Sequence, residues 1–406
     1  MNDIFADRVM LGSEDRLAEM FGGSLGEDGI KFSAGGNPNP DLFPITQMKR
    51  AFNQAIDKAG NQIFEYNTVN GFEKLRERLA HRAGQTAGIK ADRENILITQ
   101  GGQQALDLIG KLLLNAGDGV VVEAPTYVGA LSAFDQYDPC YYDVALEEDG
   151  LNLEQLELVL QTHPNIKLLY TVPDFHNPTG VTLSLSKRQK LVELAEKYDF
   201  FILEDTPYRD LRYKGAKLPA LKSFDRHGHV IFVSSFSKIL MPGLRVGWIV
   251  ADQATICHLR KLKTSSDLET PSIVLAALNQ YLENNNLEQH ITGMLATYQS
   301  RLDTMLTVLS ETMPADVHYT QPEGGFFIWL TLPEVLDTQK LLSETCIPTD
   351  RISFVPGKVF YAHKNKKNGM RLNFSGVTEK QIELGIPKLA KSIQNAITAS
   401  EVQAFR

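Results

Sequence analysis

The sequence predicts an α/β fold with a large domain on a mostly parallel sheet flanked by helices, and a smaller α+β domain. Short apolar segments rich in β-branched residues alternate with helical segments over much of the chain, a pattern typical of parallel sheets. This alternation ends before the last third, where long helical segments and isolated strands follow. A chain of 406 residues is also long enough for more than one domain.

The predicted strands of the large domain are continuously apolar, so we expect both faces of the sheet to be covered. They span residues 95–99, 119–123, 166–172, 200–204, 230–234 and 246–250. Helices are predicted between them at 103–114, 153–161 and 187–198.

The remaining segments predict how the chain is divided. Residues 1–45 are expected to form an N-terminal arm and a helix that joins the small domain. Residues 46–285 are expected to form the large domain and residues 286–406 the small one. Residues 270–309 are predicted to form one long helix or two shorter ones that bridge the two domains. Residues 325–330 and 370–374 are predicted to form strands of the small domain.

Composition excludes several classes of function. A net charge of −8 argues against a nucleic-acid partner, which requires a basic surface. Three widely spaced cysteines without a CxxC pair argue against a disulfide framework or a structural metal site, and favour the reducing cytoplasm. The first residues lack the apolar core of a signal peptide, and no apolar run approaches the ~20 residues of a membrane span.

In open α/β sheets, ligands bind beyond the carboxyl ends of the strands, so the residues there are the candidates. The first strand is followed by Gly101, Gly102 and Gln103 at the start of a helix, whose N–H groups could bind a phosphate. A plain structural turn would explain the glycines equally well. Tyr127 follows the second strand and could cover a flat ring, although a tyrosine packed under a loop is the simpler interpretation.

The next two strand ends carry polar side chains. Asn177, in Asn177-Pro-Thr-Gly180, could donate to a ring oxygen, or the segment could be only a turn. The adjacent His176 is expected to pack rather than to catalyse. Asp205 is a carboxylate in a buried context that needs a cationic partner, and a protonated pyridine nitrogen would serve. Tyr208 could reach the same ring.

Lys238 follows the fifth strand and is the expected reactive amine. A desolvated lysine has a lowered pKa and forms imines with carbonyls. Ser235, Ser237 and Arg245 would bind a phosphate beside it, whereas a surface loop with incidental charges fits poorly with the apolar flanks. Together, these strand ends supply the contacts that pyridoxal phosphate (PLP) chemistry requires.

With these residues in this order, the sequence resembles the class I and II aminotransferases, of PLP fold type I, over nearly its whole length. The matching segments are Asn177-Pro-Thr-Gly180, Asp205-x-x-Tyr208, Ser235-x-Ser-Lys238 with Pro242-Gly-Leu-Arg245-x-Gly247, and Arg371-Leu-Asn-Phe374. Segments 32–44 and 66–76 further resemble the branch with α-aminoadipate, kynurenine and broad-range aromatic aminotransferases, which the MocR-type regulators share.

The resemblance implies a role for each matching residue. Lys238 binds PLP and carries a proton between the substrate Cα and C4′ of the cofactor. Asp205 pairs with the pyridine nitrogen, and Asn177 and Tyr208 bind the ring oxygen. Tyr127 stacks on the ring. The phosphate is held by Gly101, Gly102, Gln103, Ser235, Ser237 and Arg245. The family often has serine where Gly102 stands, so a hydroxyl contact is lost there.

The resemblance also implies the substrate contacts and the assembly. Arg371 binds the α-carboxylate of the substrate, with help from the backbone at Gly36. Tyr66 reaches the cofactor of a neighbouring subunit, which implies a homodimer with shared active sites. Arg16 could read a distal carboxylate of acidic substrates; a solvated charge on a helix is the alternative.

The expected reaction is ping-pong transamination. The amino group of an aromatic, aliphatic or 2-aminoadipate-like L-amino acid passes to the cofactor, giving pyridoxamine phosphate, and then to a 2-oxo acid such as 2-oxoglutarate. Another PLP reaction, such as β-elimination or decarboxylation, would use the same ring contacts and stays open. The ligand-sensing domain of a MocR-type regulator would require a basic winged-helix segment before residue 33, and we expect none there.

Overall fold

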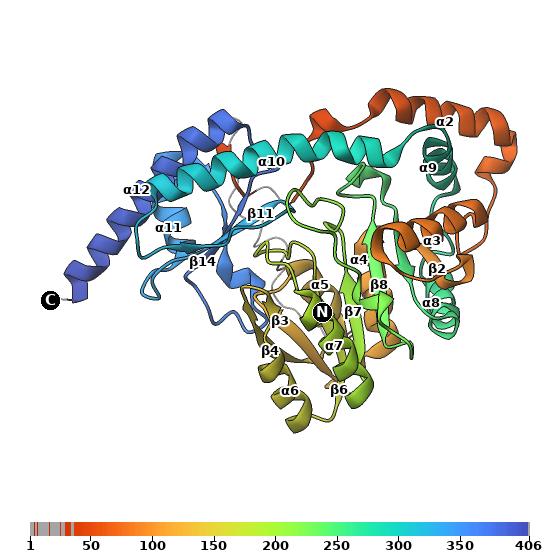
Figure 1. Cartoon of the computed structure of the whole chain (residues 1–406), viewed down its shortest axis with the longest axis horizontal. Helices are drawn as coiled ribbons and strands as arrows, with labels where there is room; N and C mark the ends of the chain where they lie inside the picture. Colours follow the sequence, from red (N-terminus) through yellow and green to blue (C-terminus); the bar gives the residue numbers. More distant parts are fainter. Residues whose placement is uncertain are drawn as a thin grey trace.

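The computed structural model describes Ile4, Ala6, Arg16, Leu25, residues 29–33 and residues 36–404. Figure 1 shows two lobes, with the long helix α10 (Leu287–Thr312) running from one to the other. Most of the arm and helix expected within residues 1–45 lie outside the described residues. Within the described residues, no helix is both long enough and apolar enough to cross a membrane.

The larger lobe is built on an eight-stranded sheet. Its strands, in spatial order, are β2 (Ile96–Thr99), β9 (Gly247–Val250), β8 (Val230–Ser235), β7 (Phe201–Asp205), β6 (Ile166–Thr171), β3 (Gly119–Ala124), β4 (Cys140–Glu147) and β5 (Gly150–Leu151). The pairs from β8 through to β4 are parallel, which confirms the prediction of a mostly parallel sheet.

Strand β9 runs antiparallel to both of its neighbours, β8 and β2. Strand β2 therefore points in the same direction as β8. The carboxyl ends of β2, β3, β6, β7 and β8 consequently meet at one edge of the sheet, and β9 begins there.

Helices cover both faces of this sheet, which is why the strands are continuously apolar. Val120 and Val122 of β3 pack into the core with Leu106 of α4 (Gly101–Leu113). Val121, which points to the opposite face, packs with residues of α6 (Leu153–Thr162) and α7 (Leu185–Tyr198). The other helices of this lobe are α2 (Ile45–Ala59), α3 (Glu73–Ala87), α5 (Val128–Phe134), α8 (Gln253–Ser266) and α9 (Ser272–Asn284).

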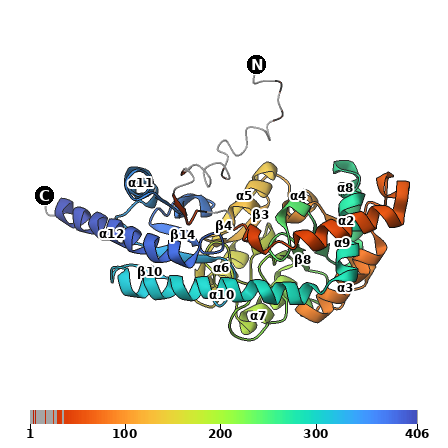
Figure 2. The ribbon, with the colours of Figure 1, turned by 90° about the horizontal axis from the view of Figure 1, so that it is seen from above.

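The smaller lobe has an antiparallel sheet in the order β10 (His318–Tyr319), β11 (Phe327–Thr331), β14 (Gly369–Asn373) and β13 (Val355–Pro356). Helices α10 and α12 (Glu379–Ala404) pack side by side on this lobe (Figure 2). The short helix α11 (Thr338–Leu341) completes it. Strand β1 (Ile30–Lys31) pairs with β12 (Ile352–Ser353) and attaches the N-terminal segment to this lobe.

Two details refine the sequence prediction. The helical region predicted at 270–309 is two helices, α9 and α10, which are separated at Asn285 and Asn286. Strand β4 was not predicted, because most of its side chains are partly or fully exposed and only Val144 is fully buried.

Candidate active site

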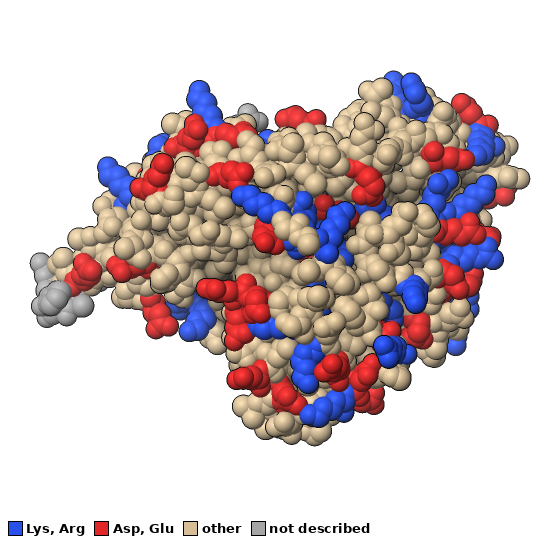
Figure 3. All heavy atoms as spheres, in the orientation of Figure 1, with Lys and Arg blue, Asp and Glu red and all other residues tan. Residues whose placement is uncertain are grey.

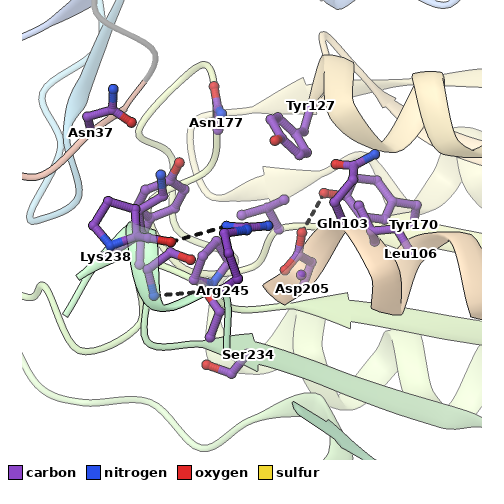
Figure 4. A pocket seen from close by; sticks show the side chains of 17 residues that line it. Asn37, Gln103, Leu106, Tyr127, Tyr170, Asn177, Asp205, Ser234, Lys238 and Arg245 are labelled. Carbon is purple, nitrogen blue, oxygen red and sulfur yellow. Dashed lines mark hydrogen bonds between the residues drawn. The ribbon is translucent and has the colours of Figure 1, made fainter. Parts of the chain in front are cut away.

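A cavity of about 240 Å³ opens where the carboxyl ends of the strands meet. Residues from five strand ends and from the start of β9 line it, as the topological argument predicted. The predicted residues among them are Gly102, Gln103, Tyr127, Asn177, Asp205, Tyr208, Ser235, Ser237, Lys238 and Arg245. Figure 4 shows the labelled side chains of Gln103, Tyr127, Asn177, Asp205, Lys238 and Arg245 converging from separate segments on one space.

Lys238 presents its amino group to this cavity. Its Nζ donates a hydrogen bond to the backbone oxygen of Gly36, at 2.8 Å. Burial, together with the positive charges of Arg371 and Arg245, lowers the pKa of Lys238 to about 8. The neutral amine is therefore much more populated near neutral pH than that of an ordinary lysine, and a neutral amine is the form that attacks a carbonyl carbon.

Asp205, at the end of β7, is 7% exposed. Burial raises its pKa to about 6, and a hydrogen bond from the Tyr170 hydroxyl and the charge of Lys238 counteract part of that rise. Tyr170 Oη lies 2.8 Å from Asp205 Oδ2, and Figure 4 marks this bond with a dashed line. A buried carboxylate in this setting binds a cationic group favourably.

The N-terminus of α4 forms an anion-binding end of the cavity. The first N–H groups of a helix have no carbonyl partner within it, and here they belong to Gly101, Gly102 and Gln103. Gly101 has φ +77°, and a Cβ there would lie 2.6 Å from Arg245 Nη2. The glycine thus allows the turn to pack directly against the Arg245 guanidinium, which brings a fixed positive charge to the same end.

Two serines line the same cavity. Ser235 closes β8, and its Oγ accepts a weak hydrogen bond from the Ser237 N–H at 3.4 Å. Both side chains are almost fully buried and line the cavity. Their hydroxyls can donate to an anion held at the start of α4.

Two tyrosines give the cavity aromatic walls. Burial raises the pKa of Tyr127 to about 12 and also raises that of Tyr208, so both hydroxyls are neutral donors at physiological pH. The Tyr127 ring lies over Gly129, where a Cβ would be 2.5 Å from the ring. Position 129, the second residue of α5, therefore has to be a small residue for the Tyr127 ring to lie where it does.

Arg371, on β14 of the small lobe, is fully buried beside the cavity. Its Nη1 donates to Asn177 Oδ1 at 2.9 Å, and its guanidinium lies 4.5 Å from the ring centre of Phe327 and 5.2 Å from that of Phe360. Burial lowers the pKa of Arg371 to about 10, which leaves it charged at neutral pH. A buried guanidinium is a strong binding group for a carboxylate.

Gly36 contributes through its backbone. It has φ +75°, and a Cβ there would lie 2.7 Å from the Phe327 ring. Only glycine fits this close approach, and its carbonyl is then available to the Lys238 amine.

Tyr66 and Arg16 lie outside the cavity. Tyr66 is 89% exposed on the surface of the larger lobe. Arg16 Nε donates to Asp135 Oδ2 at 2.9 Å, and its two other nitrogens donate to the backbone oxygens of Tyr361 and Ala362. Its side chain is 13% exposed, so the alternative of a solvated helix charge is wrong.

His176 has a structural environment, in agreement with the sequence prediction. Its Nδ1 lies 2.9 Å from Thr179 Oγ1, and its Nε2 lies 3.1 Å from the buried Glu123 carboxylate. Glu123 also accepts hydrogen bonds from the Thr171 hydroxyl and the Val172 N–H. These contacts join the segments that precede Tyr127 and Asn177.

Sequence reasoning missed several residues of the site. Tyr170 was assigned only to a strand, although a hydroxyl-bearing ring within an aliphatic run was a usable signal. Phe327 and Phe360 could not be identified, because their proximity to Arg371 depends on the packing of separate segments.

Among the described residues, no cluster of His, Cys, Asp or Glu could hold a metal ion.

Comparisons with known proteins agree with this geometry. The family model for aminotransferase class I and II matches residues 27–389. The chain is 42% identical to aromatic-amino-acid aminotransferase 1 of Thermococcus litoralis, covering 89% of this chain and 87% of that protein. It is 33% identical to the 2-aminoadipate transaminase of Thermus thermophilus, covering 91% of each.

A solved structure shows the same architecture. The kynurenine aminotransferase of Pyrococcus horikoshii, in complex with PMP, with KYN as substrate and KYA as product, superposes with a TM-score of 0.91. The two chains are 41% identical, and the match covers 97% of this chain and 98% of the other.

Proposed function

Because the chain belongs to the class I and II aminotransferases, with pyridoxal phosphate as cofactor, we propose that Lys238 is the catalytic lysine of its amino-group transfer. The observation that carries this assignment is the position of the Lys238 amine, with its pKa lowered to about 8, in the same cavity as the buried Asp205 carboxylate. A reactive amine and a carboxylate that requires a cation are the two groups that PLP needs at its opposite ends.

The remaining side chains fit the cofactor. Asp205 binds the protonated pyridine nitrogen, and this cation compensates the buried carboxylate. Asn177 and Tyr208 donate to the ring oxygen, while Tyr127 covers a face of the ring. Gly101, Gly102, Gln103, Ser235, Ser237 and Arg245 bind the phosphate at the start of α4.

PLP, when bound, supplies an electron sink that stabilises negative charge at the substrate Cα. The protein residues bind, orient and transfer protons around it. Lys238, once released from the cofactor, takes the Cα proton and returns it at C4′. Arg371 binds the α-carboxylate through two N–H groups of its guanidinium and so sets which Cα bond faces Lys238.

The proposed amino donors are aromatic, aliphatic or 2-aminoadipate-like L-amino acids, and the proposed acceptor is a 2-oxo acid such as 2-oxoglutarate. The names of the T. litoralis, T. thermophilus and P. horikoshii relatives support these classes. The same names favour amino-group transfer over β-elimination, decarboxylation or a regulatory ligand-sensing role.

We also propose a homodimer with shared active sites that acts in amino acid metabolism in the cytoplasm. The exposure of Tyr66 supports the dimer, since a large aromatic side chain that is 89% exposed is available to a second copy of the chain. On the face shown in Figure 3, Lys and Arg alternate with Asp and Glu. That face offers no broad basic area to a nucleic acid.

The experiment that tests the substrate proposal is a screen of amino donors with 2-oxoglutarate as acceptor, following glutamate formation. We expect phenylalanine, kynurenine, leucine and 2-aminoadipate to include the best donors. If only amino acids outside these classes support glutamate formation, the proposed specificity is wrong.

A further inference from the structure

A buried ion pair outside the cavity joins Lys263 and Asp267, four residues apart at the end of α8. Lys263 Nζ lies 2.7 Å from both carboxylate oxygens of Asp267. The Lys263 side chain is fully buried and that of Asp267 is 15% exposed. Apolar residues of similar volume often stabilise a fold as well as a buried pair of this kind, so the pair is weak evidence for a purely stabilising role.

The Asp267 carboxylate also holds two glutamines from the start of α4. Its Oδ2 accepts hydrogen bonds from Gln100 Nε2 at 2.8 Å and from Gln104 Nε2 at 2.6 Å. Gln104 Oε1 in turn accepts the backbone N–H of Gln100 at 2.8 Å and lies 3.3 Å from Lys263 Nζ. Both the side chain and the backbone of Gln100 are therefore fixed by this network.

Gln100 is the residue that precedes the anion-binding turn. Its carbonyl oxygen accepts a hydrogen bond from Arg245 Nη2 at 3.3 Å, and the next residue, Gly101, packs against the same guanidinium. The orientation of Gln100 thus sets both the direction of the first N–H groups of α4 and the place of Arg245.

From these contacts we propose that the Lys263–Asp267 pair is a positioning element for the phosphate end of the cofactor site. Lys263 orients the Asp267 carboxylate, and Asp267 orients Gln100 through its two amide contacts. Gln100 then presents the start of α4 and Arg245 to the phosphate. This inference rests on the proposed assignment of the cofactor phosphate to that turn.

The test compares the affinities of apo-enzymes for PLP and for pyridoxal, which lacks the phosphate. In Asp267→Asn, the charge that holds Lys263 and both glutamines is lost. We expect the dissociation constant for PLP to rise roughly tenfold or more, as the loss of charge-assisted hydrogen bonds implies, while that for pyridoxal stays unchanged. Equal dissociation constants for PLP in variant and wild type, or equal losses for both ligands, would overturn the proposal.

Asp225→Asn is the matched control. The Asp225 side chain is also buried and pairs with a lysine, Lys222, three residues away, at 2.7 Å, but the pair lies outside the cavity. We expect this variant to lose stability without a selective loss of PLP affinity. A selective loss in Asp225→Asn as large as that in Asp267→Asn would also contradict the proposal.

A second variant keeps the test decisive if Asp267→Asn does not fold. Gln104→Met leaves the ion pair intact but removes the amide contacts to Asp267 and to the Gln100 N–H, and should show the same selective loss of PLP affinity. Unchanged selectivity in Gln104→Met would count against the proposal. If wild-type apo-enzyme binds neither ligand, the cofactor-site assignment fails instead, so the two failures are distinguishable.

Discussion

The Tyr170 hydroxyl donates a hydrogen bond to the Asp205 carboxylate, with 2.8 Å between Oη and Oδ2. The two residues lie on the neighbouring strands β6 and β7, and both side chains are almost fully buried. Tyr170 leaves the carboxylate charged but fixes its direction. An ionised carboxylate aimed into a cavity is costly in the apo-protein and favourable once a cation binds.

Asp205→Asn should therefore stabilise the apo-protein at neutral pH. The folded-state pKa of about 6 exceeds the ordinary carboxyl value of 3.8, so the folded state binds the proton more tightly and its stability falls as the pH rises between these values. Above pH ~6, the substitution should add about 3 kcal/mol to the free energy of unfolding, as an order of magnitude. The gain should shrink as the pH falls toward ~4, and urea unfolding at pH 5 and pH 7.5 measures it.

Asp174→Asn is the control with the opposite sign. Burial raises the pKa of Asp174, but the positive charges of Arg188 and Arg209 outweigh burial and hold that pKa below its usual value. Arg188 Nη2 and Arg209 Nη1 donate to the two Asp174 oxygens at 2.7 and 2.8 Å. This variant should lose stability at pH 7.5. If apo Asp205→Asn loses a comparable amount of stability, the Asp205 carboxylate is already stabilised by protein groups in the absence of a bound cation.

Arg371→Ala should weaken the binding of amino acids selectively. The buried guanidinium, held by Asn177, is the proposed partner of the α-carboxylate. We expect the apparent KM for phenylalanine to rise at least roughly tenfold, since a buried charged hydrogen bond is lost. Arg371→Lys should recover only part of the affinity, because a single ammonium cannot bind two carboxylate oxygens in parallel. An unchanged KM in both variants would refute the role of Arg371.

The strands of the large sheet were predictable because both of their faces are buried. Continuous apolar runs such as Val120, Val121 and Val122 show this in the sequence, whereas β4, with its exposed positions, does not. The predicted bounds of these helices differ from those in the structure by up to two residues. For example, α4 begins at Gly101, whereas the prediction began at residue 103. The division of the chain after residues 45 and 285 stays a prediction.

The residues of the site were predictable where topology alone brings them together. Eleven candidates lie at strand ends or precede β9; ten of them line one cavity, and Gly101 is adjacent to them at the start of α4. Tyr170, which orients Asp205, carried a signal in its aliphatic run. Phe360 and Lys263 were not predictable, because they contact Arg371 and Gln104 only through the packing of separate elements. The chemical roles of the candidates, including those of Tyr66 and Arg16, stay predictions.

Arg16→Ala should lower kcat/KM for glutamate and for phenylalanine by the same factor. In this structure the Arg16 guanidinium is already bound by Asp135 and two carbonyl oxygens. Asp135→Ala should reproduce the effect, and the double variant should be little worse than either single one. A loss confined to glutamate would show instead that Arg16 leaves Asp135 to read a distal carboxylate.

Mixed dimers test whether Tyr66 serves the partner's active site. We expect Tyr66→Ala and Lys238→Ala each to have low activity. In a mixed dimer, the Lys238 of the first variant would meet the Tyr66 of the second, so one of the two sites would be intact. Random mixing should then restore roughly a quarter of wild-type activity. If mixing yields only the average of the separate variants, the sites are not shared.

The most direct measurement of the central claim follows the cofactor after a single amino donor is added without any oxo acid. Wild-type enzyme should convert stoichiometric PLP into pyridoxamine phosphate and release one equivalent of 2-oxo acid. Lys238→Ala should purify with cofactor bound through Asp205 and the phosphate contacts, yet form no detectable pyridoxamine phosphate on this time scale. Full conversion in Lys238→Ala would contradict the assignment of Lys238.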